Sequence, residues 1–368
     1  MRKAFQYRLY PSKEQAYRLT WILDRARELY NAALQERRDA WQMQRLPLTY
    51  AQQCAELPGV KEVRPEYAEV YSQVLQDVLH RLDRTFTAFY RRTKQGQAGY
   101  PRFKGRDRYD SFTFPQLGPH GLAVSGADGR LMLPGIGALK VKLHRALEGQ
   151  PKTLTLKRQG TRWYVLFSCT VEPRPLPLCD ATVGLDMGLE SFATTSDGLH
   201  IPNPRHFREA ADALAHAQQR LSRRKRGSHR RRKAARLVAR HHERIRERRR
   251  DFHHQVARRL VNTHGVIVVE DLRIRNMMQN HHLAKSISDA GWGQFISILQ
   301  AKAEEAGREV VLVNPNGTSG MCSGCGVQVP KPLSERWHLC PSCGLSIHRD
   351  FNAARNILRL GRSLQGVP

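Results

Sequence analysis

The fold is decided by residues 183–198, VGLDMGLESFATTSDG, in which two short apolar segments flank a turn at Gly188–Glu190. This pattern predicts a pair of adjacent strands. Farther along, VIVVE at 266–270 is a continuous apolar run bounded by glycine and charge, as expected for a buried parallel strand. Helices are predicted over about 205–263 and about 288–306, a strand at 308–315 and a final helix near 350–360. This order of elements suits an RNase H-like α/β fold.

The first half of the chain predicts a different architecture. Residues 3–10 alternate between apolar and polar, as a strand does, and Ser12 with Gln15 forms a capping box that begins a helix. Further helices are expected near 49–56 and over about 66–93, and short strands at 111–114, 121–124, 130–143 and 153–171, with a hairpin turn at 158–162. We therefore expect a small β-barrel or curled sheet that recruits the first strand, with a helical bundle inserted after residue 10.

The composition points to a polyanionic partner. The 368 residues include 61 Lys and Arg against 33 Asp and Glu, for a net charge of +28. No apolar run reaches the roughly 18 residues of a membrane-spanning helix, and no signal peptide is recognisable. We therefore expect nucleic acid rather than a membrane as the partner, and a cytoplasmic, nucleoid-associated location in a prokaryote.

One segment holds half of this excess charge. Residues 220–250 contain 16 Lys and Arg and two Glu, a net charge of +14. A solvated helix face is the ordinary interpretation of a charge run, but at this density the helices would repel themselves unless a phosphate backbone compensated them. We predict that this segment contacts nucleic acid through Arg223, Arg224, Lys225, Arg226, Arg230, Arg231 and Arg232.

Four of the seven cysteines form two Cys-x-x-Cys pairs, Cys322 with Cys325 and Cys340 with Cys343, and this spacing is typical of a zinc ribbon. Four thiolates close the coordination shell, so one zinc ion is expected to be structural rather than catalytic. An iron–sulfur cluster is the minor alternative. The three remaining cysteines are scattered and are expected to fill cores.

Three acidic residues are placed for metal-dependent cleavage of nucleic acid. Asp186 and Glu270 lie on predicted strands, and Asp350 begins the last helix. Carboxylates from different elements that meet in one cleft hold a pair of Mg²⁺ or Mn²⁺ ions in two-metal nucleases. Singly, Asp186 could be a turn residue, Glu270 a salt-bridge partner and Asp350 a helix N-cap.

The neighbours of these acids carry expectations of their own. Gly184 and Gly188 are expected to let a substrate backbone approach Asp186, and Asn352, Arg355 and Asn356 to line the cleft. Asp271 is expected to point away from the site as a structural residue, and His348 to be a loop histidine.

Ordered motifs over nearly the full length resemble the TnpB family, the RNA-guided nucleases of small insertion-sequence transposons. They are FQYRLYPSKEQ, GYPRFKGR, SFTFPQ, GLDMGLESFATTSDG, SRRKRGS, VVEDL, SISDAGWGQF, the paired Cys-x-x-Cys and RDFNAARN. The resemblance implies a wedge-type β-barrel at 1–10 and 106–178, a helical recognition bundle at 11–105, a RuvC-like nuclease at 180–314 and 345–368, and a zinc ribbon at 315–344. Asp186, Glu270 and Asp350 fall on the family's catalytic positions.

The same resemblance implies two nucleic-acid partners, a guide RNA from the transposon's right end and a double-stranded target DNA. A short transposon-adjacent motif would be required beside the target. Tyr50, Gln76 and Thr113 fall near the positions that read this motif, and glutamine can pair with adenine in a bidentate manner.

Three functions therefore stand side by side. The first is an RNA-guided, Mg²⁺-dependent DNA endonuclease with one active site that cuts both strands in turn. The second is an RNA-guided DNA-binding regulator that has lost its nuclease, although such a protein would be expected to lose one of the three acids. The third is an RNase H-like transposase, although those usually carry a glutamate on the last helix.

Overall fold

The computed structural model describes residues 1–368 except 98, 107, 118–128, 333–334 and 366–368, so the strand expected at 121–124 lies outside the described residues. The chain forms two compact units, Met1–Glu172 and Pro173–Pro368. Each unit is described by itself.

The first unit contains a six-stranded antiparallel sheet in the order β2-β5-β6-β1-β4-β3. Its strands are β1 (Arg2–Tyr10), β2 (Ser111–Phe114), β3 (Arg130–Leu133), β4 (Gly137–Lys142), β5 (Gln150–Gln159) and β6 (Arg162–Thr170). The predicted first strand lies between β6 and β4, and Gln159 pairs with Arg162 across the predicted hairpin turn. Among the described strands β2 and β3 do not pair with each other, so the sheet is open rather than a closed barrel.

The helices between β1 and β2 are α1 (Lys13–Gln44), α2 (Tyr50–Ala55), α3 (Leu57–Val63), a 3₁₀ turn η1 (Pro65–Tyr67) and α4 (Ser72–Lys94). The capping box is confirmed, because Ser12 and Gln15 exchange side-chain and backbone hydrogen bonds of 3.1 Å. The helix predicted from about 66 begins instead at Ser72, since Pro65 opens a separate turn. Helices and sheet share one apolar core, with Phe5, Tyr7, Leu75, Leu79 and Phe112 among its fully buried side chains.

The second unit contains a five-stranded sheet in the order β11-β10-β7-β8-β9. Its strands are β7 (Thr182–Asp186), β8 (Ser191–Thr195), β9 (His200–Pro202), β10 (Val266–Glu270) and β11 (Glu309–Val313). β7 pairs with β8 in the antiparallel sense and with β10 in the parallel sense, and β10 is parallel to β11. The predicted strand pair and the predicted buried parallel strand are both confirmed.

The helices of this unit are α5 (His206–Glu209), α6 (Ala211–Ser222), α7 (His229–Thr263), α8 (Ile274–Met277), α9 (His281–Ala290), α10 (Trp292–Ala306) and α11 (Arg349–Leu364). The helix predicted from about 288 is two helices, because Gly291 adopts a left-handed conformation with φ of 65° between α9 and α10. A small antiparallel pair, β12 (Trp337–Leu339) and β13 (Ser346–His348), precedes α11. No helix among the described residues has the length and apolar character needed to cross a membrane.

The two faces of this sheet have different coverings. On one face Val183, Leu185 and Ile267 share a core with α7 and α10, and on the other Val268 and Val313 meet Ile357 of α11. On the α11 face Gly184 allows very close contact, because a Cβ there would lie 2.2 Å from the carbonyl oxygen of Ala354. The expectation that Gly184 admits a substrate backbone is wrong, because the backbone it admits is that of α11. A Cβ on Gly188 would meet the carbonyl oxygen of Ser191 at 2.9 Å, so this glycine serves the tight β7–β8 turn.

Candidate active site

The three acids predicted to bind metal lie at one edge of the five-stranded sheet. Asp186 ends β7 and Glu270 ends β10, and the parallel register pairs Val269 with Leu185, so that Glu270 falls opposite Asp186 one step farther on. Neighbouring strands lie roughly 4.8 Å apart. Asp350 is the second residue of α11, which contacts both strands.

Strand periodicity turns these side chains toward the same helix. Alternate residues of a strand share a face, so Asp186 lies on the face of Gly184 and Glu270 on the face of Val268. Both Gly184 and Val268 contact α11. Gly184 packs against the Ala354 carbonyl of that helix, and Val268 packs against its Gly361. Asp271 is exposed, as expected for the residue after the end of β10.

The carboxylates perturb one another. Burial raises the pKa of Asp186 well above its usual value, and the neighbouring charges of Glu270 and Asp350 raise it further, against the opposing effect of Arg349 and Arg336. Burial also raises the pKa of Glu270. A bound cation would favour the ionised form of such carboxylates.

Glu270 is held by a residue that the sequence analysis missed. Its carboxylate accepts a 2.6 Å hydrogen bond from the hydroxyl of Thr318, a buried residue in the chain leading to the first cysteine pair, and this bond lowers the pKa of Glu270. Among the described residues Glu270 has no ion-pair partner, so the interpretation of Glu270 as half of a salt bridge is wrong.

The start of α11 also differs from the expectation. His348, not Asp350, is the N-cap, and its Nδ1 accepts a hydrogen bond of 3.3 Å from the backbone N–H of Asp350. The readings of Asp350 as an N-cap and of His348 as a loop histidine are therefore both wrong. The Asp350 carboxylate is free to face the site, where it lies 3.7 Å from Arg336, whose guanidinium also lies 2.9 Å from Glu190.

Two asparagines of α11 secure the chain that precedes the ribbon. Asn352 accepts a 2.8 Å hydrogen bond from the backbone N–H of Ser323 and donates to the Met321 carbonyl at 2.7 Å. Asn356 donates to the carbonyl of Thr318 at 2.9 Å. Both asparagines are buried, so they anchor this segment and do not line a cleft as expected. Arg355 is exposed, with its guanidinium near the ring of Phe351.

The four predicted zinc ligands form one cluster. The sulfur atoms of Cys322, Cys325, Cys340 and Cys343 all lie within 4.8 Å of one another, with pairs at 3.5 and 3.6 Å. Zinc–sulfur bonds of about 2.3 Å in a tetrahedron place the sulfurs roughly 3.8 Å apart, which fits this spacing. Among the described residues this is the one group of His, Cys, Asp and Glu so tightly clustered, and the three carboxylates are spread more widely.

Each cysteine pair is followed by a glycine that completes a tight turn. Gly326 donates to the carbonyl of Cys322 and Gly344 to that of Cys340, and both glycines have positive φ, 80° and 72°. Backbone N–H groups, that of Cys343 first, lower the pKa of the Cys340 thiol to about 6. Donors that favour a thiolate before metal arrives suit a zinc site.

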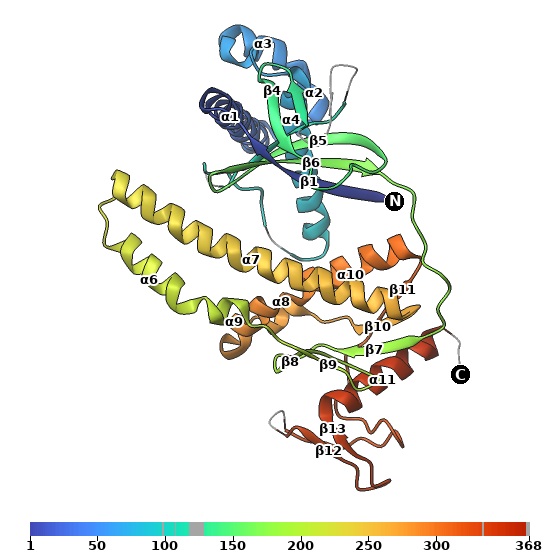
Figure 1. The fold of residues 1–368 in the computed structure, drawn as a ribbon. Helices are drawn as coiled ribbons and strands as arrows, with labels where there is room; N and C mark the ends of the chain where they lie inside the picture. Colours follow the sequence, from blue (N-terminus) through green and yellow to red (C-terminus); the bar gives the residue numbers. More distant parts are fainter. Residues whose placement is uncertain (98, 107, 118–128, 333–334, 366–368) are drawn as a thin grey trace. The chain divides into compact units, whose positions relative to one another are not determined.

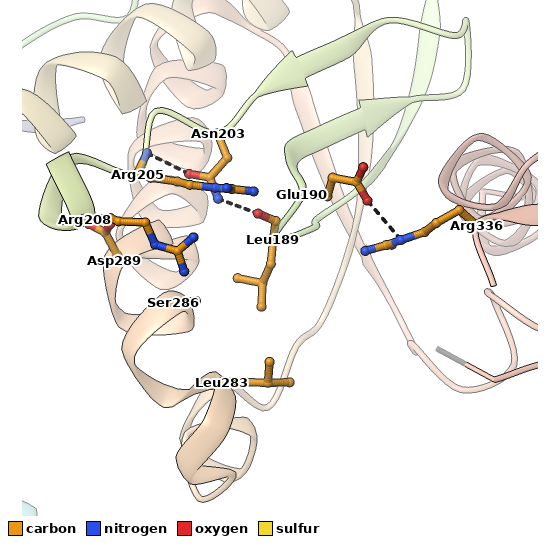
Figure 2. A pocket seen from close by; sticks show the side chains of 9 residues that line it. All are labelled: Leu189, Glu190, Asn203, Arg205, Arg208, Leu283, Ser286, Asp289 and Arg336. Carbon is orange, nitrogen blue, oxygen red and sulfur yellow. Dashed lines mark hydrogen bonds and ion pairs between the residues drawn. The ribbon is translucent and has the colours of Figure 1, made fainter. Parts of the chain in front are cut away.

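A pocket of about 430 Å³ lies beside the carboxylates and shares Arg336 with them (Figure 2). Its polar groups serve the fold, because Asn203 donates to the Leu189 carbonyl at 3.0 Å and Asp289 accepts the Phe207 N–H at 3.0 Å. Among the described residues the guanidinium groups of Arg205 and Arg208 have no hydrogen bond or ion pair. The pocket is lined by Leu189, Glu190, Asn203, Arg205, Arg208, Leu283, Ser286, Asp289 and Arg336.

The basic segment forms a helical hairpin in which α6 lies against α7 (Figure 1). Seven of the ten residues that line a groove of about 810 Å³ on it are Lys or Arg, and three of the predicted contacts, Arg224, Arg230 and Arg232, are among them. Arg231 has another role. Its guanidinium donates to the carbonyls of Leu221 and Arg224 at 2.8 and 3.0 Å, and so braces the turn between the helices. Arg223, Lys225 and Arg226 are exposed in that turn.

The residues expected to read a DNA motif lie in the first unit. Tyr50 begins α2, and its ring lies 5.5 Å from that of His80 on α4. Gln76 is exposed on α4, one turn before His80. The Thr113 hydroxyl lies 2.8 Å from that of Thr155 and also accepts a hydrogen bond from Arg81, so it is already engaged.

Three family models match the chain. The OrfB_IS605 model, described as "Probable transposase", matches residues 166–281, and the model "Cas12f1-like, TNB domain" matches residues 292–357. A model described as "Helix-turn-helix domain" matches residues 1–45. In the structure that last segment is one strand followed by one 32-residue helix, so it does not form a helix-turn-helix.

Two of the curated relatives match over 98% of the chain. The chain is 37% identical over 369 residues to the "Putative RNA-guided DNA endonuclease" of Streptomyces pristinaespiralis, a match that covers 98% of this chain and 90% of that protein. It is 29% identical over 381 residues to the "Putative RNA-guided DNA endonuclease InsQ" of Escherichia coli (strain K12), over 98% and 93% of the two chains. Proteins of Acanthamoeba polyphaga mimivirus named "TnpB-like" are 26% identical over 238 residues, 60% of this chain.

A solved structure described as "Structure of the mini-RNA-guided endonuclease CRISPR-Cas_phi3" has a similar fold. The TM-score is 0.55 at 9% sequence identity, over 98% of this chain and 92% of that one. By its end-to-end similarity to the curated relatives and its match to the OrfB_IS605 model, the chain belongs to the TnpB family of transposon-encoded proteins, whose curated members are named as RNA-guided DNA endonucleases.

Proposed function

We propose that this protein is an RNA-guided DNA endonuclease of an insertion-sequence transposon, which cleaves double-stranded DNA beside a short adjacent motif. The observation that carries the proposal is the meeting of Asp186, Glu270 and Asp350 at one edge of the sheet. The order of the sheet, with three parallel strands β11, β10 and β7 followed by β8 antiparallel to both of its neighbours, supports an RNase H-like (RuvC) nuclease. A nuclease would explain why the buried Glu270 and Asp350 and the half-buried Asp186 are all acidic.

The residues present fit a site for two Mg²⁺ or Mn²⁺ ions. Three carboxylates from two strands and a helix supply the hard oxygen ligands that these ions prefer, as in nucleases that hold two ions roughly 3.5–4 Å apart. When bound, such a pair activates a water molecule and stabilises the leaving 3′-oxygen of the cleaved strand.

The protein's own groups position these ligands. The Thr318 hydroxyl fixes one oxygen of Glu270, and the N-terminus of α11 favours the negative charge of Asp350. Arg336 bridges Asp350 and Glu190 in the structure, and a guanidinium there can instead neutralise a phosphate of the cleaved strand.

The 430 Å³ pocket beside the acids has room for an unpaired nucleotide of that strand. Arg205 and Arg208 supply charge for its phosphate, and Leu189 and Leu283 an apolar surface for its base. Because Asn203 and Asp289 are already hydrogen-bonded within the fold, little remains to read base identity. Cleavage at this site would therefore be indifferent to sequence, which leaves specificity to a guide.

The partners follow from charge and from the family. The groove on α6 and α7 supports contact with a phosphate backbone, in this proposal that of a guide RNA derived from the transposon's right end. In the first unit, the sheet would serve as the wedge domain and the inserted helices as the recognition domain, with Tyr50, Gln76 and Thr113 near the adjacent motif. A nucleoid-associated location in a prokaryotic cytoplasm follows from this function.

The proposal is tested with the full chain purified together with the RNA encoded downstream of its gene. The bound RNA is sequenced, and guide-matched duplex DNA with a randomised flank is offered with Mg²⁺, with EDTA, and to the Asp186→Ala variant. Cuts that require guide, flank and metal and disappear in the variant support the nuclease. A bound guide with a protected but uncut target would favour the regulator, and absence of a specific RNA would favour the transposase.

A further inference from the structure

A second pocket, of about 190 Å³, lies in the first unit between α1, α4 and the chain that leads into β2. Two tyrosines line it, Tyr30 from α1 and Tyr109 from the segment before β2, with their rings 5.9 Å apart. The sequence analysis assigned nothing to either residue.

Both phenol hydroxyls are buried without a hydrogen bond. Tyr30 is 2% exposed and Tyr109 6%, and neither hydroxyl has a partner of acceptable geometry within the described residues. Thr85 lies near the first hydroxyl and Arg81 near the second, but neither is within hydrogen-bond geometry of the phenol oxygen. The Thr85 hydroxyl donates instead to the Arg81 carbonyl, and the Arg81 guanidinium contacts Asp77, Ser111 and Thr113. A buried polar group without a partner is costly, so two in one pocket indicate a missing acceptor.

The same pocket carries uncommitted positive charge. Lys104 and Arg108 line it, and among the described residues neither side chain has a hydrogen bond or an ion pair. The Asn31 side chain donates to the Lys104 carbonyl at 3.0 Å and accepts from the Lys104 backbone N–H at 2.8 Å. These two bonds fix the backbone of Lys104, whose ammonium lies above the ring of Tyr30. Among the described residues that line the pocket the one carboxylate is that of Asp110, and it lies 3.5 Å from Lys157 outside the pocket.

These four groups, two neutral donors and two cations, match a phosphate group. The volume is below the roughly 300 Å³ at which pockets begin to enclose drug-sized ligands, so a phosphate fits where a base would not. We propose that this pocket binds a backbone phosphodiester of the bound nucleic acid, with hydrogen bonds from Tyr30 and Tyr109 and charge from Lys104 and Arg108. The inference rests on the proposed function in one respect, that the chain binds RNA and DNA.

Replacing each phenol by a benzene ring separates this idea from a purely structural role. Tyr30→Phe and Tyr109→Phe remove only the hydroxyl, and for an unpartnered buried hydroxyl the melting temperature should stay the same or rise. Affinity for nucleic acid should nevertheless fall about tenfold for each variant, because a hydrogen bond to a charged phosphate is lost. Tyr17→Phe is the matched control, because Tyr17 lies on α1 like Tyr30 and is 73% exposed. It should change neither the melting temperature nor the affinity for nucleic acid.

The measurement uses the full chain with the Asp186→Ala substitution, so that no cleavage disturbs binding. One arm titrates the protein's own RNA, and the other titrates guide-matched duplex DNA into the protein–RNA complex. Weakening in one arm alone identifies which nucleic acid supplies the phosphate. The double variant Lys104→Gln/Arg108→Gln removes the charge that neutralises one phosphate, so it should lower the slope of log affinity against log salt by about 0.9 for duplex DNA or about 0.7 for a single strand.

The proposal is overturned if both phenylalanine variants bind RNA and DNA as the Tyr17→Phe control does, or if they lose stability in proportion to affinity. The second result would show that the hydroxyls serve the fold. These outcomes do not depend on the nuclease proposal. If the protein with intact Asp186 leaves guide-matched DNA uncut, the nuclease proposal fails. If the phenylalanine variants still weaken binding in that case, the phosphate pocket stands without it.

Discussion

The contact between β7 and α11 can be tested by adding a single methyl group. Gly184→Ala would place a Cβ 2.2 Å from the Ala354 carbonyl oxygen and 2.7 Å from the Leu358 backbone nitrogen. Neither atom belongs to a side chain that can turn away. The helix that carries Asp350 would have to move relative to the strand that carries Asp186.

The size of the effect follows from the same contact. An ordinary contact begins at 3.4 Å, so α11 must retreat by 1.2 Å, the difference between 3.4 and 2.2 Å. Overpacking of this kind costs about 1–3 kcal/mol, and about 2 kcal/mol in a unit of this size lowers the melting temperature by roughly 4–8 °C. A displacement of about 1 Å between catalytic groups lowers the rate about 100-fold.

Guided cleavage of target DNA and thermal unfolding followed by circular dichroism measure both effects on one preparation. Gly59→Ala is the control, because a Cβ at Gly59 meets nothing within 4 Å and alanine favours the helix α3 in which it lies. If Gly184→Ala cut DNA and melted as the Gly59→Ala control does, the close approach of α11 to β7 and the placement of Asp350 by it would both be refuted.

Three further predictions concern charge and metal. Asp186→Asn should abolish cleavage yet raise the melting temperature in EDTA by about 2–4 °C, since the raised pKa of Asp186 makes its ionisation costly to the fold. This gain should shrink as the pH falls, because the acid of the unsubstituted protein is then protonated; a gain that grew toward low pH would contradict the assignment. Cys340→Ser should leave the chain without zinc by metal analysis and destabilise the segment around the ribbon, and full cleavage activity without zinc would disprove a structural role. Arg230→Gln with Arg232→Gln should weaken RNA binding and flatten its salt dependence without changing the melting temperature, whereas Arg231→Gln should lower the melting temperature.

Local rules in the sequence were enough for much of the fold. The alternation in β1, the capping box at Ser12 and the apolar run of β10 each specify an element from a few adjacent residues. The spacing of the cysteines likewise predicts their cluster. Two of the features that the sequence did not predict depend on contacts between distant residues. The residues adjacent to Gly184 in the sequence do not predict that α11 packs against it. Those adjacent to Thr318 do not predict that its hydroxyl bonds to Glu270, 48 residues earlier.

The candidate site was predictable to the same extent. The acids could be selected because a charge at the end of an apolar strand is unusual, but the groups that orient them have no such signature. Threonine and arginine are common in loops and helices, so Thr318 and Arg336 stand out only once their partners are known. Asn356 was noticed in the sequence, but its role as an anchor for the Thr318 carbonyl was not predicted. Arg231 shows the converse, since in a run of arginines the one that braces the turn looks the same as those that face solvent.

The segment from Pro315 to Ser323 connects the carboxylate site to the cysteine cluster. At its start Thr318 holds Glu270, at its end Cys322 enters the cysteine cluster, and between them Asn352 and Asn356 of α11 secure it. In the proposed nuclease, a chain without zinc would hold its three acids while the segment that carries Thr318 is anchored at one end only. Zinc binding would then be a requirement for cleavage that is met at folding and not at each turnover.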